Sequence, residues 1–211
     1  KNAETLLAEH APFLVISGDA LTDFDLSALI RYHRDRSAAL TMALYRVQDP
    51  LEYGVINVHE DGRVAHFLGK PNWGGVTSDT VNTGIYIVQP EVLARIPSGQ
   101  RVDWSQDVFP AMMARGDALY GYTADGYWCD IGTISEYSRA NADLLNGRLY
   151  LGELGTRIGP DVWSEGTVDI APDAQLIGPI YLGDEVKINR GAIVHGPTVI
   201  RDYTVMDDRS R

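Results

Sequence analysis

The 211-residue sequence has a single cysteine, Cys129, and no long apolar run. One cysteine excludes an internal disulfide bond and is typical of a protein kept in a reducing compartment. No apolar stretch approaches the roughly 18 residues of a membrane-spanning helix, and the first residues carry no signal-peptide pattern. We therefore expect a cytoplasmic protein without a membrane partner.

Positive charge is also scarce. Lysine and arginine number 18 against 29 aspartates and glutamates, so the net charge is −11. Because phosphate backbones are bound by clusters of lysine and arginine, this balance argues against a nucleic-acid partner. The hydrophobic fraction of 45% is ordinary for a globular protein with an ample core.

Residues 13–21, F-L-V-I-S-G-D-A-L, predict a strand followed by a turn. Four apolar residues in succession are typical of a strand that is buried on both faces in the middle of a parallel sheet. Asp19 would then lie at the carboxyl end of the strand. In open α/β sheets that edge is where ligands bind.

A second acidic residue has a similar setting. Asp130 stands among large apolar residues in the stretch 127–133, Y-W-C-D-I-G-T, two positions before a glycine. Two carboxylates presented in this way suit Mg²⁺, and we predict that Asp19 and Asp130 meet and hold that ion. The alternative is that each aspartate merely ends a strand or caps a turn.

Strands and helices alternate through the first two thirds of the chain. Apolar patterns predict strands at 38–47, 55–58, 64–68, 85–88 and 119–123. Capping signals predict helices after Asp25, from Pro90, around Pro110 as far as Gly116, and from Thr133 (with its capping-box partner Glu136) to Gly147. The pair Asp61-Gly62 supplies the positive φ that a hairpin turn needs. This alternation is typical of an α/β fold.

After Gly155 the apolar residues repeat with a period of six. Eight of the nine positions spaced by six from Ile158 to Met206 are aliphatic or methionine, and a small or branched residue follows each by four. A period of six is typical of a parallel β-helix, in which each hexad supplies one short strand. An amphipathic α-helix cannot hold it, because six residues turn through about 600°.

Five short motifs follow one another between residues 13 and 146. They are Ser17-Gly18-Asp19, Tyr53-Gly54-Val55, Gly69-Lys70-Pro71, Asn82-Thr83-Gly84-Ile85-Tyr86 and Trp128-Cys129-Asp130-Ile131-Gly132. With the hexads that follow, their order and spacing resemble the sugar-1-phosphate nucleotidyltransferase family, and within it the mannose-1-phosphate guanylyltransferases (GDP-mannose pyrophosphorylases). The resemblance implies part of a Rossmann-like nucleotide-diphospho-sugar transferase domain over 1–147, a linker over 148–157 and an incomplete left-handed β-helix of hexapeptide repeats over 158–211.

The resemblance also implies a reaction. A nucleoside triphosphate, GTP by this comparison, would react with a hexose 1-phosphate such as mannose 1-phosphate to give a nucleotide sugar and pyrophosphate. An oxygen of the sugar phosphate attacks the α-phosphorus in line, so that catalysis is positioning plus neutralisation of charge. Asp19 and Asp130 would hold Mg²⁺, which draws charge off the α-phosphate. Lys70 would lie against the sugar phosphate.

The same resemblance assigns a sugar pocket. Asn82 would hydrogen-bond sugar hydroxyls with its donor and its acceptor. Gly54 would let the backbone approach the sugar, with Tyr53 and Thr83 beside it. From the residues alone, Asn82 could equally serve a turn before Gly84.

Three other residues in or beside the motifs keep a structural interpretation. Lys70 could belong to a solvated loop, the common setting of an exposed lysine. Trp128 and Tyr127 are expected in the core, with no ligand assigned to them.

Two features depart from the family pattern. Gly69 stands where the family usually has a glutamate that helps to hold the sugar, which puts the sugar's identity in question. The Gly-rich loop that cradles the triphosphate in this family has no counterpart in the 211 residues. We therefore expect an N-terminally truncated chain that is inactive by itself.

Two other functions fit parts of the sequence. A non-catalytic regulatory or scaffolding paralogue would keep the fold and use the β-helix for contacts in a homo-oligomer. A β-helix acyltransferase would use a coil histidine as a base, and His195 lies among the hexads. Its place in the hexad normally faces outward, so we expect His195 on the surface.

Overall fold

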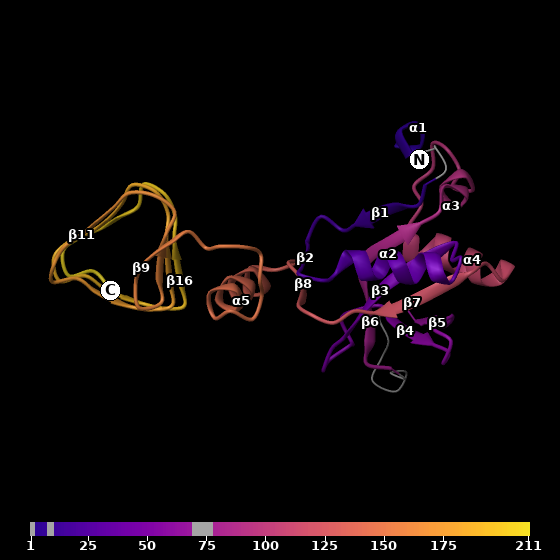
Figure 1. The fold of residues 1–211 in the computed structure, drawn as a ribbon, viewed down its shortest axis with the longest axis horizontal. Coiled ribbons are helices and arrows are strands. Elements are labelled where there is room, and N and C mark those ends of the chain that lie inside the picture. The colour runs from indigo at the N-terminus through magenta and orange to yellow at the C-terminus, as the bar shows by residue number, and fades with distance from the viewer. Residues whose placement is uncertain (1–2, 8–10, 69–77) are drawn as a thin grey trace. The chain divides into compact units, whose positions relative to one another are not determined.

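The computed structural model describes residues 3–7, 11–68 and 78–211 (Figure 1). The chain divides into two compact units, Lys1–Asp130 and Ile131–Arg211. No helix in the described ranges is long and apolar enough to cross a membrane.

A six-stranded mixed sheet forms the centre of the first unit. Its strands are β1 (Phe13–Ile16), β3 (Leu40–Arg46), β4 (Val55–Val58), β5 (Val64–Leu68), β6 (Thr80–Val88) and β7 (Leu119–Thr123). The order is β5-β4-β6-β3-β7, and β1 also pairs with β6. β3 and β7 are parallel, whereas the other pairs are antiparallel. The predicted hairpin of β4 and β5 is confirmed, with Gly62 at a φ of 84° in its turn.

The position of β1 differs from the expectation of a central strand in a parallel sheet. In the described part of the chain, β1 pairs only with β6, and the two strands are antiparallel. Phe13 and Val15 pack against the core, whereas Leu14 and Ile16 are 39% and 43% exposed. The prediction was wrong because an apolar run indicates a strand but does not determine which strands flank it.

Side chains from both faces of β3 and β6 fill the core. Alternate residues of a strand point to opposite faces, and both faces of these two strands are covered. One face packs against α4 (Phe109–Arg115), with Phe109 fully buried. The other face packs against α2 (Leu26–Asp35), with Leu29 at 2% exposure.

Local capping signals placed the helices of this unit correctly. Asp25 accepts a hydrogen bond from the Ala28 N–H at the start of α2 (2.9 Å). The predicted helix from Pro90 is present as α3 (Pro90–Ala94), and Gly116 ends α4 with a φ of 71°. The short helix α1 (Glu4–Leu7) was not predicted. The sequence did not predict the π-helical segment of residues 104–108 that leads into α4.

The second unit begins with α5 (Ile134–Leu145). Thr133 Oγ1 accepts a hydrogen bond from the Glu136 N–H (3.1 Å), which confirms Thr133 as the N-cap, and the Thr133 hydroxyl donates to Glu136 Oε2 (3.1 Å). The helix contacts strand β16 (Thr198–Ile200), and the compact unit therefore starts before the helix. The expected domain boundary at residue 147 and the linker over 148–157 stay predictions.

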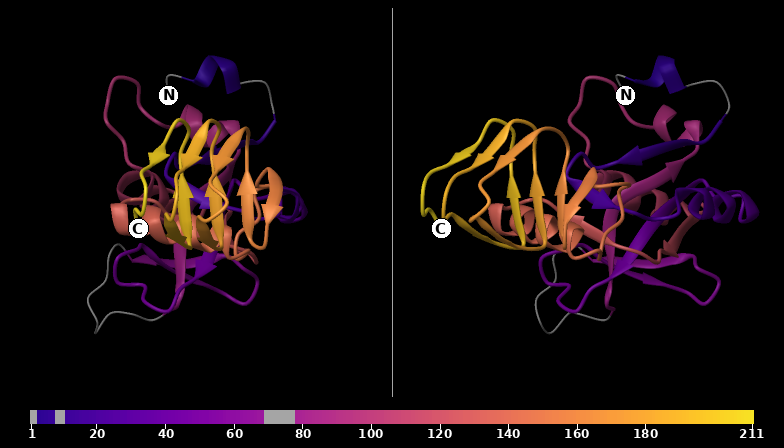
Figure 2. Two further views of the ribbon diagram at one scale, coloured as in Figure 1. Left: turned by 90° about the vertical axis from the view of Figure 1, so that its left-hand side faces the viewer. Right: turned by 60° about the vertical axis from the view of Figure 1, so that its left-hand side comes forward.

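Short strands of the second unit stack in three parallel ladders (Figures 1 and 2). The strands are β9 (Thr156–Gly159), β10 (Val162–Ser164), β11 (Val168–Ile170), β12 (Gln175–Ile177), β13 (Ile180–Leu182), β14 (Val186–Ile188), β15 (Ile193–His195), β16 and β17 (Val205–Met206). Paired residues lie 18 positions apart, as in Val162 opposite Ile180 and Val168 opposite Val186. This arrangement is compatible with the expected β-helix. Antiparallel β9 is the exception to the parallel pairing.

The hexad positions from Ser164 onward face the interior of this coil, whereas the first, Ile158, is 43% exposed. Leu182, Ile188 and Val194 are buried in one apolar cluster. Ser164, the one polar residue among the nine positions, is also buried, and its hydroxyl donates to the Gly166 carbonyl (2.7 Å). His195 is exposed, as expected.

Candidate functional site

Strand β6 brings several of the sequence motifs together. Asn82, Thr83 and Gly84 lie within this strand. The strand expected at 85–88 would have left these three residues before it. The Asn82 N–H donates to the Gly54 carbonyl (2.8 Å). The Trp128 Nε1–H donates to the Thr83 carbonyl (3.1 Å). Two motifs distant in the sequence are therefore fixed to neighbouring residues of β6.

The motif of Asp19 is fixed to the next residue of β6. The Ser17 N–H donates to the Gly84 carbonyl (2.9 Å). Gly84 has a φ of 76°, and a Cβ at this position would lie 2.8 Å from Ser17 Cβ. Only glycine meets both conditions without strain. The Ser17 hydroxyl in turn donates to Asp19 Oδ1 (2.6 Å) and orients the exposed carboxylate.

Asp130 lies on a two-stranded ribbon next to the motif of Asp19. Its strands are β2 (Ala20–Thr22) and β8 (Trp128–Asp130). They are antiparallel, and Asp130 lies opposite Ala20, the residue after Asp19. Facing residues of such a pair have Cα atoms roughly 4.5–5.5 Å apart. The backbone therefore places the two aspartates at adjacent positions, although more than a hundred residues separate them in the chain.

Hydrogen bonds that sequence reasoning missed hold this ribbon. The Thr22 hydroxyl donates to the Tyr127 carbonyl (2.8 Å), and the Tyr127 N–H donates to Asp23 Oδ1 (2.7 Å). The partners lie about a hundred positions apart, so no local sequence pattern predicts these hydrogen bonds. The ribbon positions Asp130 through these contacts.

Aromatic rings pack behind the ribbon. Trp128 is 7% exposed, which confirms its expected place in the core. The Tyr53 ring meets the Trp128 ring edge-on, with 5.4 Å between centroids, and the Tyr45 ring lies 6.0 Å away on a tilted plane. Tyr53 is half-buried at this position. Its role in lining a sugar pocket stays a prediction.

Asn82 and Thr83 point to opposite faces of β6, because alternate side chains of a strand diverge. Asn82 Oδ1 accepts from the Gly84 N–H (3.1 Å), a local backbone contact that lies within strand β6 and not in the turn considered as an alternative. Burial raises the pKa of Tyr86 to about 12, and a hydrogen bond with the Asn82 side chain opposes that rise. The Asn82 side chain is half-buried and polar contacts already hold it in place.

Thr83 was expected among the substrate-binding residues, but its side chain points into the protein. It is 2% exposed, and its hydroxyl donates to the Ala43 carbonyl (2.7 Å). The structure therefore gives the Thr83 hydroxyl an internal role between β6 and β3.

The third motif lies outside the described residues. Lys70 and Gly69 belong to it, so the expected contact of Lys70 with the sugar phosphate and the consequence of Gly69 stay predictions.

The donor set at the ribbon suits Mg²⁺. This ion keeps several waters and takes one or two protein carboxylates together with substrate phosphates. Asp19 and Asp130 supply two carboxylates at adjacent backbone positions. In the described ranges, no group of three or more histidine, cysteine, aspartate or glutamate side chains forms a metal-binding cluster. A metal held here would therefore need water and substrate as its other ligands.

Comparisons with known proteins agree with the motifs. Residues 1–147 match the family model described as nucleotidyl transferase. A mannose-1-phosphate guanylyltransferase of Mycobacterium tuberculosis (strain ATCC 25618 / H37Rv) is 35% identical over 187 residues, which cover 88% of this chain and 51% of that protein. A UTP–glucose-1-phosphate uridylyltransferase of Synechocystis sp. is 34% identical over 192 residues, which cover 89% of this chain and 50% of that protein. The chain spans about half the length of these relatives.

Solved structures share the fold. A UTP-bound UGPase from Acinetobacter baumannii superposes with a TM-score of 0.57 at 20% identity and covers 65% of this chain and 52% of that chain. HddC from Yersinia pseudotuberculosis, complexed with GMP-PN, has a TM-score of 0.55 at 23% identity and covers 66% and 57%. These similarities support the Rossmann-like α/β fold. The family model covers well over half of the 211 residues, and the chain therefore belongs to the nucleotidyl transferase family, in agreement with its resemblance to sugar-1-phosphate nucleotidyltransferases.

Proposed function

We propose that the protein containing this chain transfers a nucleotidyl group from a nucleoside triphosphate to a hexose 1-phosphate and releases pyrophosphate. The observation that carries the proposal is the β2–β8 ribbon, which sets Asp130 opposite the neighbour of Asp19 beside β6. GTP and mannose 1-phosphate are the proposed substrates, supported by the 35% identity to a mannose-1-phosphate guanylyltransferase.

The chain's own residues would position the reacting groups. Asp19 and Asp130 would hold Mg²⁺, which when bound supplies positive charge at the α-phosphate. Ser17 keeps the Asp19 carboxylate oriented before substrate arrives. Asn82 and Gly54, joined by a backbone hydrogen bond, would form one side of the sugar site. Lys70 would neutralise the sugar phosphate, because its ammonium group is a compact charge.

The 211 residues contain no Gly-rich triphosphate loop, and we propose that they are inactive on their own. Assays therefore need the full-length protein. UTP with glucose 1-phosphate is the second substrate pair to test, since a uridylyltransferase relative is 34% identical. Turnover with one pair and not the other assigns the substrate.

Replacing either aspartate tests the site. Asp19→Asn and Asp130→Asn each remove a carboxylate charge, and we expect pyrophosphate release by the full-length protein to fall by about a hundredfold or more. The matched control is Asp169→Asn, at an exposed position of the coil, which should keep full activity. Full activity in either site variant contradicts the proposed role of the pair. No turnover of any hexose 1-phosphate by the unaltered protein favours the scaffolding paralogue instead.

We further propose that the second unit is a left-handed β-helix of hexapeptide repeats that joins copies of the protein. The 18-residue offset between paired strands supports the coil. Light scattering of the full-length protein tests the assembly. A monomer at micromolar concentration contradicts it.

A further inference from the structure

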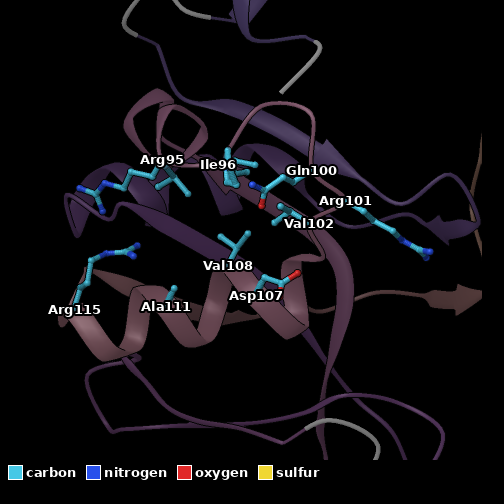
Figure 3. A pocket seen from close by; sticks show the side chains of 11 residues that line it. Arg95, Ile96, Gln100, Arg101, Val102, Asp107, Val108, Ala111 and Arg115 are labelled. Atoms are coloured by element: carbon cyan, nitrogen blue, oxygen red, sulfur yellow. The ribbon is translucent and has the colours of Figure 1, made fainter.

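A cavity of about 260 Å³ opens between α3 and α4 on the first unit (Figure 3). Its wall is largely apolar, formed by Val92, Ile96, Val102, Val108 and Ala111. Among the residues that the structure describes, none from the sequence motifs lines it. The cavity holds the volume of roughly nine waters, enough for a small organic molecule.

Two arginines stand at one side of this cavity. Figure 3 shows Arg95 and Arg115 together on that side, whereas Arg101 extends away on the other. Both share one carboxylate oxygen, since Arg95 Nη1 and Arg115 Nη2 each lie 2.9 Å from Asp117 Oδ2. One negative charge therefore faces two positive charges. Among the described residues, the ion pairs of these two arginines involve Asp117 alone.

The arginines can accept a further anion. A guanidinium has five N–H donors, and the hydrogen bonds and ion pairs with Asp117 engage one nitrogen of Arg95 and two nitrogens of Arg115. About half of each side chain is exposed, so the remaining donors are accessible. Asp107, the acidic residue in the lining, is already engaged as acceptor of the Asp103 N–H (2.7 Å). In a chain of net charge −11, this rim is locally positive.

We propose that this cavity binds a small organic anion. The apolar body of the ligand fills the space between α3 and α4, and its carboxylate or phosphate pairs with Arg95 and Arg115. Guanidinium groups match both headgroups in geometry. The apolar wall gives binding energy, and the arginine pair selects the charge. The site is separate from the ribbon of Asp19 and Asp130 and does not depend on the proposed function.

Three probes of similar size test the proposal. They are 3-phenylpropionate, 2-phenylethyl phosphate and the neutral 3-phenylpropionamide, titrated against the ¹⁵N-labelled chain and followed by NMR. We expect saturable shifts in residues 92–117, with at least one anion binding about tenfold tighter than the amide. The tighter of the two anions identifies the headgroup.

Two variants locate the probe. Arg115→Met should weaken binding of the anion by about tenfold or more and leave the amide unchanged, because only the charge-assisted hydrogen bonds are lost. Ala111→Leu should weaken all three probes, because it fills the cavity. The control is Arg148→Met, which removes an arginine paired with the shielded Asp143 of the second unit and should change nothing. Melting temperatures check that each variant is folded.

Three results would overturn the proposal. One is equal affinity for 3-phenylpropionate and its amide together with weaker binding of the phosphate. Another is anion binding that survives Arg115→Met unchanged, a surface substitution that should not disturb folding. The last is the absence of saturable shifts in residues 92–117 with every probe.

Discussion

Neighbouring residues of β6 have different roles at the candidate site. The backbone of Asn82 is hydrogen-bonded to Gly54, and the backbone of Gly84 is hydrogen-bonded to Ser17. The Thr83 hydroxyl, in contrast, is buried against β3. All three residues belong to one sequence motif, but the side chain of Thr83 points to the opposite face of the strand from that of Asn82. If Thr83 contributes to substrate binding, it does so by positioning its neighbours in β6, because its own hydroxyl is buried.

His33 makes stability depend on pH. It is fully buried on α2, with Nδ1 2.9 Å from Thr41 Oγ1 and Nε2 3.2 Å from the Gln89 amide nitrogen. Burial lowers its pKa from 6.5, helped by the nearby Arg34 charge. The unfolded chain therefore binds a proton at this residue more readily than the folded chain. The resulting loss of stability begins as the pH falls through the unfolded value near 6.5.

The prediction is that His33→Gln reduces this pH dependence. Urea unfolding at pH 7.5 and 5.5 measures it, and the difference in unfolding free energy between the two pH values should shrink in the variant. His59→Gln, at an exposed histidine, is the control and should keep the original difference. An unchanged difference in His33→Gln would show that other groups cause the loss at low pH.

Elements with local signals were predictable from the sequence. Asp25 and Thr133 cap helices through residues three positions away, so the pattern and the structure agree. The hexad period similarly marks strands that pair at a fixed offset of 18 residues. Elements set by distant partners were not predictable. The edge position of β1 and the hydrogen bond between Thr22 and Tyr127 depend on contacts between residues that lie 69 or more positions apart.

Gly84 links two of these elements, and its replacement tests the link. A Cβ on Gly84 would meet Ser17, on the turn after β1, and would be strained at a φ of 76°. We expect Gly84→Ala to lower the unfolding free energy by about 1–3 kcal/mol, as measured by chemical denaturation. Gly99→Ala is a matched control, because its φ is 73° and a Cβ added there would meet no atom within 4 Å. Equal losses would mean that strain alone acts and that the contact with Ser17 is unimportant.

Two separate cores organise the part of the chain that the structure describes. One consists of the clusters on the two faces of the β3–β6 sheet, and the other lies inside the coil of β10–β17. No residue belongs to both the sheet clusters and the coil cluster among those described. A defect in one core therefore removes contacts from that core first. The two units should respond to mutation as separate cooperative bodies.

Matched cavities in the two cores test this independence. Leu182→Ala, at a fully buried position of β13, should destabilise its unit by about 2–5 kcal/mol because the lost methyl groups leave a cavity. Phe109→Ala, at a fully buried position of α4, is the reciprocal variant. Hydrogen exchange followed by mass spectrometry should show faster exchange in residues 156–206 for the first variant and in β3 and β6 for the second. Faster exchange throughout the chain in both variants would contradict separate units, since it would require a single transition that couples the hexad coil to the nucleotidyl transferase sheet.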